Sequence, residues 1–199
     1  MIKPLASLFI SLATACSAPG HPVEPVPAAP AATAAPTPAA PNVPEPSIYD
    51  LELRLRDANN HDVGLDIQRG HPVLITMFYA SCPVACPVLI DELGRIASEL
   101  PPAVQADLRI VLVSFDPRDT PAVLSELAAT RKLDARWTLA GASEIDARTL
   151  AAVLGFKYRK LANGDYFHGA TIVALDADGQ PIARAEKMGQ RETLFAAFR

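Results

Sequence analysis

Residues 73–87, VLITMFYASCPVACP, decide the fold of this chain. The first part, residues 73–79, is a nearly unbroken apolar run, as expected of a strand buried in the middle of a sheet. The second part carries Cys82 and Cys86 and ends at Pro87, a residue that favours the first position of a helix. We therefore expect a buried strand, then Cys82 in a turn, Cys86 at the N-cap of a helix and Pro87 as its first residue.

Three other stretches predict strands around this one. Residues 108–115 (LRIVLVSF) and 171–175 (TIVAL) are apolar runs that predict two more buried strands. Leu51, Leu53 and Leu55 alternate with charged residues, and this period of two predicts a half-exposed strand.

Helical patterns lie between the predicted strands. After the cysteines, apolar side chains recur at the spacing of one helix face until two prolines end the pattern: Leu89, Leu93, Ile96 and Leu100, then Pro101 and Pro102. Thr120 before Pro121 predicts the start of a second helix. Ser143 and Asp146 form a variant of the capping box, and Gly155 predicts the end of that third helix. Because strands and helices alternate, the sequence predicts an α/β domain with a mixed sheet.

The composition limits the classes of partner. Of the 199 residues, 50% are hydrophobic and 20% are charged, and the formal net charge is -4, so the chain can build a core but is mildly acidic. The sequence has no cluster of Lys and Arg that would offset this acidity. These features exclude nucleic acid as an expected partner.

The N-terminus resembles an export signal. Lys3 supplies a positive charge, and residues 5–15 (LASLFISLATA) are apolar or small but shorter than the roughly 20 residues that span a bilayer as a helix. The small residues at its end lead into Cys16, which resembles a bacterial lipobox. We expect residues 1–15 to be a lipoprotein-type signal peptide. Lipid on Cys16 would then anchor the protein to a bacterial membrane, in the cell envelope and facing the periplasm.

The alternative is an ordinary secretory signal cleaved after Ala15 or Ala18, which would export the chain without a lipid. Either signal places the domain in an oxidising compartment. The chain has three cysteines, which cannot all pair with one another, so we expect separate roles for Cys16 and for the pair Cys82 and Cys86.

Residues 16–46 are expected to join the lipid anchor to the domain. Ten of the thirty residues from 17 to 46 are proline, accompanied mainly by alanine, so this segment cannot bury much apolar surface. In polyproline II geometry it would reach on the order of 90 Å. We expect a tether rather than a recognition ligand, because no aromatic or basic anchor accompanies the prolines. The globular domain is expected over residues 47–199.

The predicted position of the cysteine pair determines its chemistry. The N-terminal end of a helix carries partial positive charge and free N–H groups, which stabilise a thiolate. Two thiolates four residues apart can converge on one soft ion, copper(I) or zinc, or they can close into a disulfide. A purely structural disulfide is the weaker interpretation, because so small a loop would add little stability.

A third metal ligand would have to come from elsewhere in the chain. His21 lies in the proline-rich segment, and His61 and His71 lie in loop-like stretches where an exposed histidine is the ordinary expectation. His168 precedes the apolar run at 171–175, so its loop can bring it over the sheet edge that holds the cysteines. Position alone leaves open whether His168 is a surface histidine or a ligand.

Four segments of the chain, in order, resemble the SCO/SenC family of copper chaperones for cytochrome c oxidase. They are residues 78–87 (FYASCPVACP), 113–121 (VSFDPRDTP), 136–141 (RWTLAG) and 155–179, which contains GFKYRK and DYFHGATIVALDADG. The match covers about residues 48–199. The resemblance implies a thioredoxin-like fold, an α/β architecture whose central mixed sheet is flanked by helices. It also implies one bound copper ion, Cu(I) or Cu(II), with Cys82, Cys86 and His168 as its ligands.

The same resemblance implies a function. We expect a metallochaperone rather than an enzyme, delivering copper to the binuclear copper site of cytochrome c oxidase during its assembly. Its partner would be an oxidase subunit or another copper chaperone of the envelope. The alternative is a thiol–disulfide oxidoreductase, with Cys82 and Cys86 as a redox pair that keeps partner cysteines reduced. The three-residue spacing of the pair, and the lack of a proline before Thr171, argue against a thioredoxin-type reductase. A peroxidase-like enzyme is weaker still.

The motifs depart from the family's usual pattern at two positions. Val84 stands where the family often has Asp, which removes a negative charge beside the metal, and Gly169 stands where Ser is common.

For Asp116 and Asp119 we expect turn and helix-start chemistry rather than contact with a metal or partner. The run Asp-Ala-Asp-Gly at residues 176–179 predicts a hairpin turn rather than a calcium site.

Overall fold

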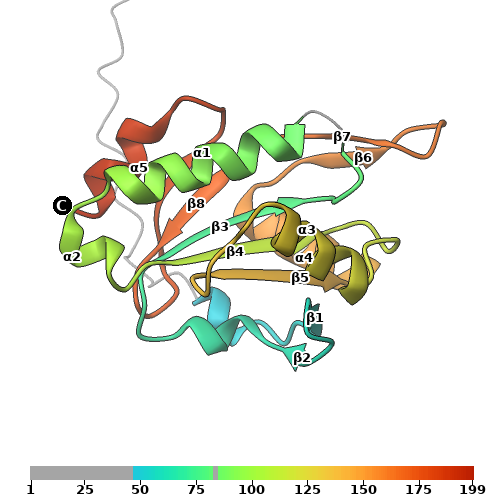
Figure 1. Cartoon of the computed structure of the whole chain (residues 1–199), viewed down its shortest axis with the longest axis horizontal. Helices are drawn as coiled ribbons and strands as arrows, with labels where there is room; N and C mark the ends of the chain where they lie inside the picture. The colour runs from blue at the N-terminus through green and yellow to red at the C-terminus, as the bar shows by residue number, and fades with distance from the viewer. Residues whose placement is uncertain (1–46, 83–84) are drawn as a thin grey trace, which may run out of the picture. The chain divides into compact units, whose positions relative to one another are not determined.

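The computed structural model describes residues 47–82 and 85–199 (Figure 1). Its elements in chain order are η1 (Ile48–Asp50), β1 (Leu55–Asp57), β2 (Asp62–Val63), η2 (Leu65–Gln68), β3 (Val73–Phe78), α1 (Ala85–Glu99), α2 (Pro102–Gln105), β4 (Arg109–Ser114), α3 (Pro121–Thr130), β5 (Trp137–Ala142), α4 (Glu144–Leu154), β6 (Tyr158–Lys160), β7 (Tyr166–His168), β8 (Ile172–Leu175), β9 (Pro181–Ala185) and α5 (Arg191–Ala197). The predicted signal peptide, Cys16, the tether and His21 lie outside the described residues. Within the described part of the chain, no helix combines the length and apolar character needed to cross a bilayer.

Seven strands form one mixed sheet in the order β2-β1-β5-β4-β3-β8-β9. The neighbours β5, β4 and β3 run parallel, and the outer strands pair antiparallel with their neighbours. Strands β6 and β7 form a separate hairpin that projects beyond one end of the large sheet (Figure 1). The predicted α/β architecture with a mixed sheet is confirmed.

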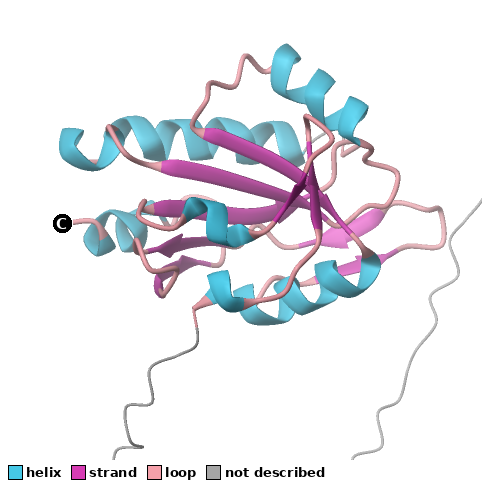
Figure 2. Cartoon of the chain, turned by 90° about the horizontal axis from the view of Figure 1, so that it is seen from below, coloured by secondary structure: helices cyan, strands magenta, loops and turns pink. Residues whose placement is uncertain are grey.

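The three apolar runs of the sequence are the central strands of this sheet. Every residue of β3 and β8 is buried, as is every residue of β4 after Arg109. Helices lie on both sides of the large sheet (Figure 2), so both faces of its central strands are covered. These strands therefore lack the alternation of apolar and polar residues that is typical of a strand with one solvent-exposed face. The predicted bounds of these strands differ from the observed ones by at most one residue at each end.

The predicted starts of the second and third helices, which are α3 and α4 in the structure, are confirmed. Thr120 caps α3, its hydroxyl accepting the Val123 N–H, and Pro121 is the first helical residue. Ser143 caps α4 by accepting the Asp146 N–H. Gly155 ends α4 with a φ of 64°, a left-handed conformation that glycine adopts without the clash of a Cβ.

Two local predictions are wrong. The strand predicted from Leu51 to Leu55 begins only at Leu55, because the Leu53 N–H bonds to the Leu51 carbonyl and the chain turns there. Helix α1 begins at Ala85, so Cys86 is its second residue rather than its N-cap. Pro87 is still tolerated in the first turn, where its missing N–H would have no intrahelical partner.

The segment after β8 turns back as a hairpin, as predicted. The Gly179 N–H donates to the Asp176 carbonyl, and the side chain of Asp176 accepts the N–H groups of Asp178 and Gln180. Gly179 has a φ of 80°, which favours glycine. The Asp176 carboxylate therefore stabilises the turn itself, in line with the expectation of a hairpin.

Candidate metal centre

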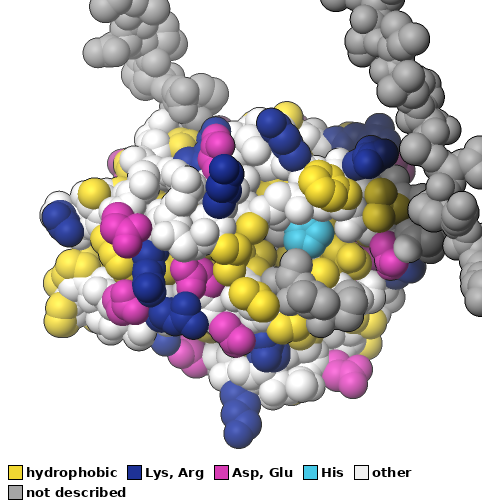
Figure 3. Space-filling model, turned by 90° about the horizontal axis from the view of Figure 1, so that it is seen from above, with side chains coloured by type: hydrophobic (Ala, Val, Ile, Leu, Met, Phe, Trp, Pro, Cys, Tyr) yellow, Lys and Arg dark blue, Asp and Glu magenta, His cyan; other side chains and the backbone are white. Residues whose placement is uncertain are grey.

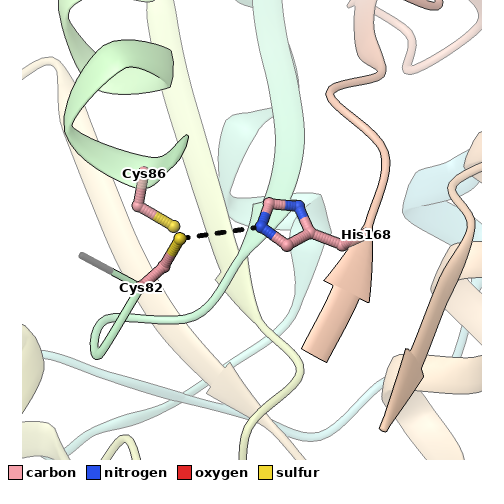
Figure 4. A group of neighbouring side chains, drawn as sticks. All are labelled: Cys82, Cys86 and His168. Carbon is pink, nitrogen blue, oxygen red and sulfur yellow. Dashed lines mark hydrogen bonds between the residues drawn. The ribbon is translucent and has the colours of Figure 1, made fainter. Parts of the chain in front are cut away.

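Three separate elements meet near the carboxyl end of β3. Cys82 lies in the turn after β3, and its backbone N–H donates to the carbonyl of Tyr79. Cys86 lies in the first turn of α1, and His168 is the last residue of β7. Figure 4 shows the two sulfurs and the imidazole pointing toward one another. The fold thus brings together the three candidate ligands named from the sequence.

The donor atoms of these three residues are close enough to share one ion. All of them lie within 4.8 Å of one another, and Cys82 Sγ lies 3.9 Å from His168 Nε2. Metal bonds of about 2.0–2.3 Å in a trigonal arrangement would need donors about 3.8 Å apart, so a small side-chain movement is enough. Among the described residues, no other group of three or more Cys, His, Asp or Glu side chains converges in this way. Two thiols and one imidazole favour a soft ion such as copper(I) or zinc.

The ring of His168 is held so that one nitrogen is free for the metal. Its Nδ1 lies 2.7 Å from the carbonyl oxygen of Gly169. A carbonyl oxygen only accepts hydrogen bonds, so Nδ1 must carry the proton. In the neutral ring the lone pair is then on Nε2, the atom nearest to Cys82.

Cys86 lies deeper than a reactive thiol usually does. It is 2% exposed, and its Sγ lies 3.0 Å from the Tyr79 carbonyl, to which the thiol donates. Burial raises the pKa of Cys86 to about 12, and the neighbouring Cys82 adds to the rise. The thiolate stabilisation expected from the helix N-terminus is therefore outweighed at Cys86 by the loss of solvent. A metal that binds here must displace the thiol proton.

Tyr79 adds a polar group to the site that sequence reasoning did not single out. Burial raises the pKa of Tyr79 to about 12, and its hydrogen bond with the Cys82 side chain adds to the rise. The Tyr79 ring stands edge-on to the His168 ring, with 5.5 Å between centroids. Tyr79 is therefore a neutral phenol that contacts two of the three candidate ligands.

A cluster of aromatic rings supports the hairpin that carries His168. Phe115, which follows β4, stacks on Tyr158 of β6 at 4.4 Å and meets Tyr166 of β7 edge-on at 5.1 Å. Phe156 stacks on the His168 ring at 6.1 Å. These contacts fix the hairpin against the large sheet, and they fix His168 with it.

The sequence contained a signal for this cluster. Three of the four tyrosines of the chain, Tyr79, Tyr158 and Tyr166, lie within or beside the motifs of the cysteines and of His168. Periodicity could not reveal their common location, because Tyr79 follows β3 whereas Tyr158 and Tyr166 lie on the β6–β7 hairpin, which is distant from β3 in sequence.

Asp119 bonds to the segment that carries the cysteines without reaching the ligands themselves. Its Oδ2 accepts the Ala80 N–H at 2.6 Å and the Ser114 hydroxyl at 2.5 Å. Burial raises the pKa of Asp119 above its usual value, against the opposing effect of these two hydrogen bonds. The N-cap of α3 is Thr120, so Asp119 is not the helix cap. Its hydrogen bond to Ala80 instead supports the loop that leads to Cys82.

Asp116 does form the expected turn. Its Oδ1 accepts the Arg118 N–H, and its carboxylate also pairs with the Arg118 guanidinium at 2.6 Å. Burial alone would raise the pKa of Asp116, but the hydrogen bonds and charge of Arg118 hold it below the usual value. The same guanidinium donates to the Gly164 carbonyl at the tip of the β6–β7 hairpin.

The other described histidines lie away from this site. His61 is exposed and lies 3.6 Å from a carboxylate oxygen of Asp57. His71 is partly exposed and lies 2.6 Å from Asp107. Neither belongs to the converging group, in line with the expectation that both are loop histidines.

Fold and site together define a class: a thioredoxin-like domain in which two thiols and one imidazole converge at a strand–helix junction, close enough to hold one metal ion. Its family follows from comparison with known proteins. The chain belongs to the SCO1/SenC family, whose model matches residues 43–199. The family resemblance seen in the sequence motifs is thereby confirmed.

The relative and the two solved structures described next are each less than 25% identical to this chain. A protein of Stutzerimonas stutzeri described as copper-binding is 24% identical over 131 residues, and the match spans 64% of each chain, less than two thirds of that relative. The SCO1/SenC family lipoprotein of Bacillus anthracis has a TM-score of 0.65 and 19% identity, covering 77% of this chain and 95% of the other. Copper-bound ScoI of Bradyrhizobium japonicum has a TM-score of 0.57 and 24% identity, covering 73% and 94%. These structures confirm the thioredoxin-like fold.

Proposed function

We propose that this protein binds one copper ion through Cys82, Cys86 and His168 and delivers it to cytochrome c oxidase as a metallochaperone of the cell envelope. The observation that carries the proposal is the convergence of three donors within 4.8 Å. Such a donor set suits Cu(I) and can also hold Cu(II). The copper named in the descriptions of the Stutzerimonas and Bradyrhizobium proteins supports the choice of metal.

In this function copper is cargo, and release proceeds by ligand exchange. Each step breaks one bond from copper to this protein and forms one bond from copper to a thiolate or imidazole of the partner. The copper keeps its oxidation state, and the protons of the partner's thiols pass to the vacated Cys82 and Cys86. The raised pKa of Cys86 favours the last step, because a thiol that holds its proton tightly competes poorly for the metal.

The partner we propose is the oxidase subunit that holds the binuclear copper site, or another copper chaperone of the envelope. Lipid on Cys16 and the proline-rich residues 17–46 would place the domain near the membrane on the periplasmic side. The lipoprotein of Bacillus anthracis, a relative in the same family, supports this arrangement.

Thiol–disulfide exchange is the second candidate, because the sulfur atoms of Cys82 and Cys86 lie within 4.8 Å of each other. Cys82 would be the attacking thiol, since burial keeps Cys86 protonated, and Cys86 would resolve the mixed disulfide. The imidazole beside Cys82 favours the metal function, since exchange needs no third ligand.

Copper transfer distinguishes the two functions. The copper(I)-loaded protein is mixed with the copper-free soluble domain of the oxidase subunit from the same organism, with its cysteines already reduced. After the two proteins are separated again, we expect the acceptor to contain copper, measured as its metal content, when wild type is the donor and to contain none when the donor is His168→Ala, whereas His71→Ala should behave as wild type. No transfer to reduced acceptor, combined with rapid reduction of an oxidised one by both wild type and His168→Ala, would favour the oxidoreductase.

The proposed anchor has its own test. Cys16→Ser is expected to move the protein from the membrane fraction to the soluble fraction of the envelope, because the single lipid attachment point is lost. Unchanged membrane association of Cys16→Ser would exclude lipidation at this position.

A further inference from the structure

A cavity of about 590 Å³ opens beside the candidate metal centre, between α4 and the β6–β7 hairpin. Its apolar lining comes from the aromatic cluster, with Phe115, Phe156, Tyr158 and Tyr166 contributing rings. We call this cavity the aromatic groove. Its size and lining are those of a site that receives a bulky apolar group.

The aromatic groove shares its wall with the metal centre. Phe156 lines the groove and stacks on the His168 ring at 6.1 Å, and Phe115 lies 5.8 Å from the same ring. A group bound in the groove would therefore sit one ring away from a candidate copper ligand.

The border of the groove is positively charged on a protein that is negative overall. Four basic side chains line it, Arg148, Lys157, Arg159 and Lys160, against the single acidic Glu144. Glu144 is paired with Arg148, whereas no ion pair within the described residues involves Lys157 or Lys160. The formal net charge of the chain is -4, so this local excess of positive charge runs against the average. It favours an anionic occupant.

The surroundings of the ligands favour a protein segment over a small molecule. Val88 of α1 and Phe167 of β7 are large apolar side chains that are 52% and 62% exposed, and they lie two residues after Cys86 and one before His168. On the face drawn in Figure 3, hydrophobic side chains gather around a histidine. Contiguous exposed apolar surface of this kind is typical of a face that another protein covers.

We propose that the aromatic groove docks an acidic segment of the copper partner, which places an aromatic or large aliphatic side chain in the groove against the partly exposed rings of Tyr158 and Tyr166. The acidic side chains of that segment would contact Lys157 and Lys160. This inference rests on the proposed function only for the identity of the partner. The docked segment would hold the partner's ligands beside His168, where exchange begins.

The test uses a synthetic probe and the reduced, metal-free protein. The probe is an acetylated and amidated octapeptide of six acidic residues around two central phenylalanines, and its control carries lysine at every acidic position. Amide chemical shifts are followed by NMR during titration. We expect the acidic peptide to shift the residues of the groove, to bind more weakly at high salt, and to bind at least about tenfold more tightly than its control.

A matched pair of variants tests the charge. Lys157→Glu with Lys160→Glu reverses two cations at the groove, and Lys132→Glu with Lys187→Glu makes the same change of net charge at exposed sites outside the groove lining. We expect the groove variant to weaken peptide binding by about tenfold and the control variant by less than about twofold. Equal effects of the two variants, equal binding of the two peptides, or shifts confined to other surfaces would overturn the proposal.

Failure of this inference can be told from failure of the proposed function. Copper titration of the groove variant is expected to match wild type, because neither lysine side chain is a candidate ligand. Cys82→Ser, in contrast, should lose copper and still bind the acidic peptide. Sodium acetate at the same carboxylate concentration is the last control; displacement of the peptide by acetate alone would mean that the groove binds small anions and is not a docking surface.

Discussion

Replacing Asp119 by alanine tests whether one buried carboxylate supports the loop that carries Cys82. Asp119 is 7% exposed, and its Oδ2 accepts both the Ala80 N–H at 2.6 Å and the Ser114 hydroxyl at 2.5 Å. Ala80 lies two residues before Cys82. Asp119→Ala therefore removes the acceptor of two donors at once and leaves the hydroxyl of Ser114, which is fully buried, beside a new gap.

The expected loss of stability follows from these contacts. A buried donor left without its acceptor costs about 1–3 kcal/mol, and the Ala80 N–H, which is only partly buried, costs less than the Ser114 hydroxyl. The sum is about 3 kcal/mol. Asp119→Asn keeps one acceptor oxygen and removes a charge that burial disfavours, so its expected cost is less than about 1 kcal/mol.

Urea unfolding of the reduced, metal-free protein measures both values. With a slope of about 2 kcal/mol per molar urea, Asp119→Ala should lower the midpoint by about 1.5 M and Asp119→Asn by less than about 0.5 M. The copper affinity of Asp119→Ala should fall as well, because the segment before Cys82 loses its support. Equal midpoints for Asp119→Ala and wild type, or equal losses for the two variants, would refute the reasoning.

Two further predictions concern protons. Because burial raises the pKa of Cys86 to about 12, copper(I) must displace its proton; the affinity of the reduced protein, measured by competition with a chromophoric chelator, should rise with pH by about tenfold per unit for each proton released. An affinity independent of pH would contradict this. Arg118 holds the pKa of Asp116 below its usual value, so this pair stabilises the fold above the unfolded pKa of the carboxyl and the contribution is lost as pH falls through the lowered value. Arg118→Gln should therefore lower the unfolding midpoint more near neutral pH than in acid, and a loss that is the same at both pH values would rule out this role.

The sequence predicted the central sheet and the position of the cysteine pair because both depend on local patterns. An apolar run without polar alternation marks a strand with two covered faces, and β3 is such a strand in the structure. A proline in the first helical turn marks a helix start, which placed Cys86 at that end of α1 within one residue of its actual position.

The third ligand could not be derived in this way. His168 reaches the cysteines because the β6–β7 hairpin packs on Phe115 and Phe156, and those contacts join residues distant in sequence. Its position in the sequence made His168 a candidate, and only the resemblance to a family favoured it as a ligand over a surface histidine. Local sequence patterns also could not predict the raised pKa of Cys86. The position at a helix N-terminus predicts a stabilised thiolate and a lowered pKa, whereas burial, which depends on the tertiary structure, raises the pKa and has the larger effect.

Copper(I) titration of the reduced protein tests most directly whether the two sulfurs and the imidazole form one site. A chelator competition is run on wild type, on His168→Ala and on His71→Ala, whose histidine pairs with Asp107 outside the converging group. We expect wild type and His71→Ala to bind one copper per chain with equal affinity, and His168→Ala to bind it about a hundredfold more weakly or worse. Equal copper affinity of His168→Ala and wild type would show that the imidazole is not a ligand and would contradict the proposed metal centre.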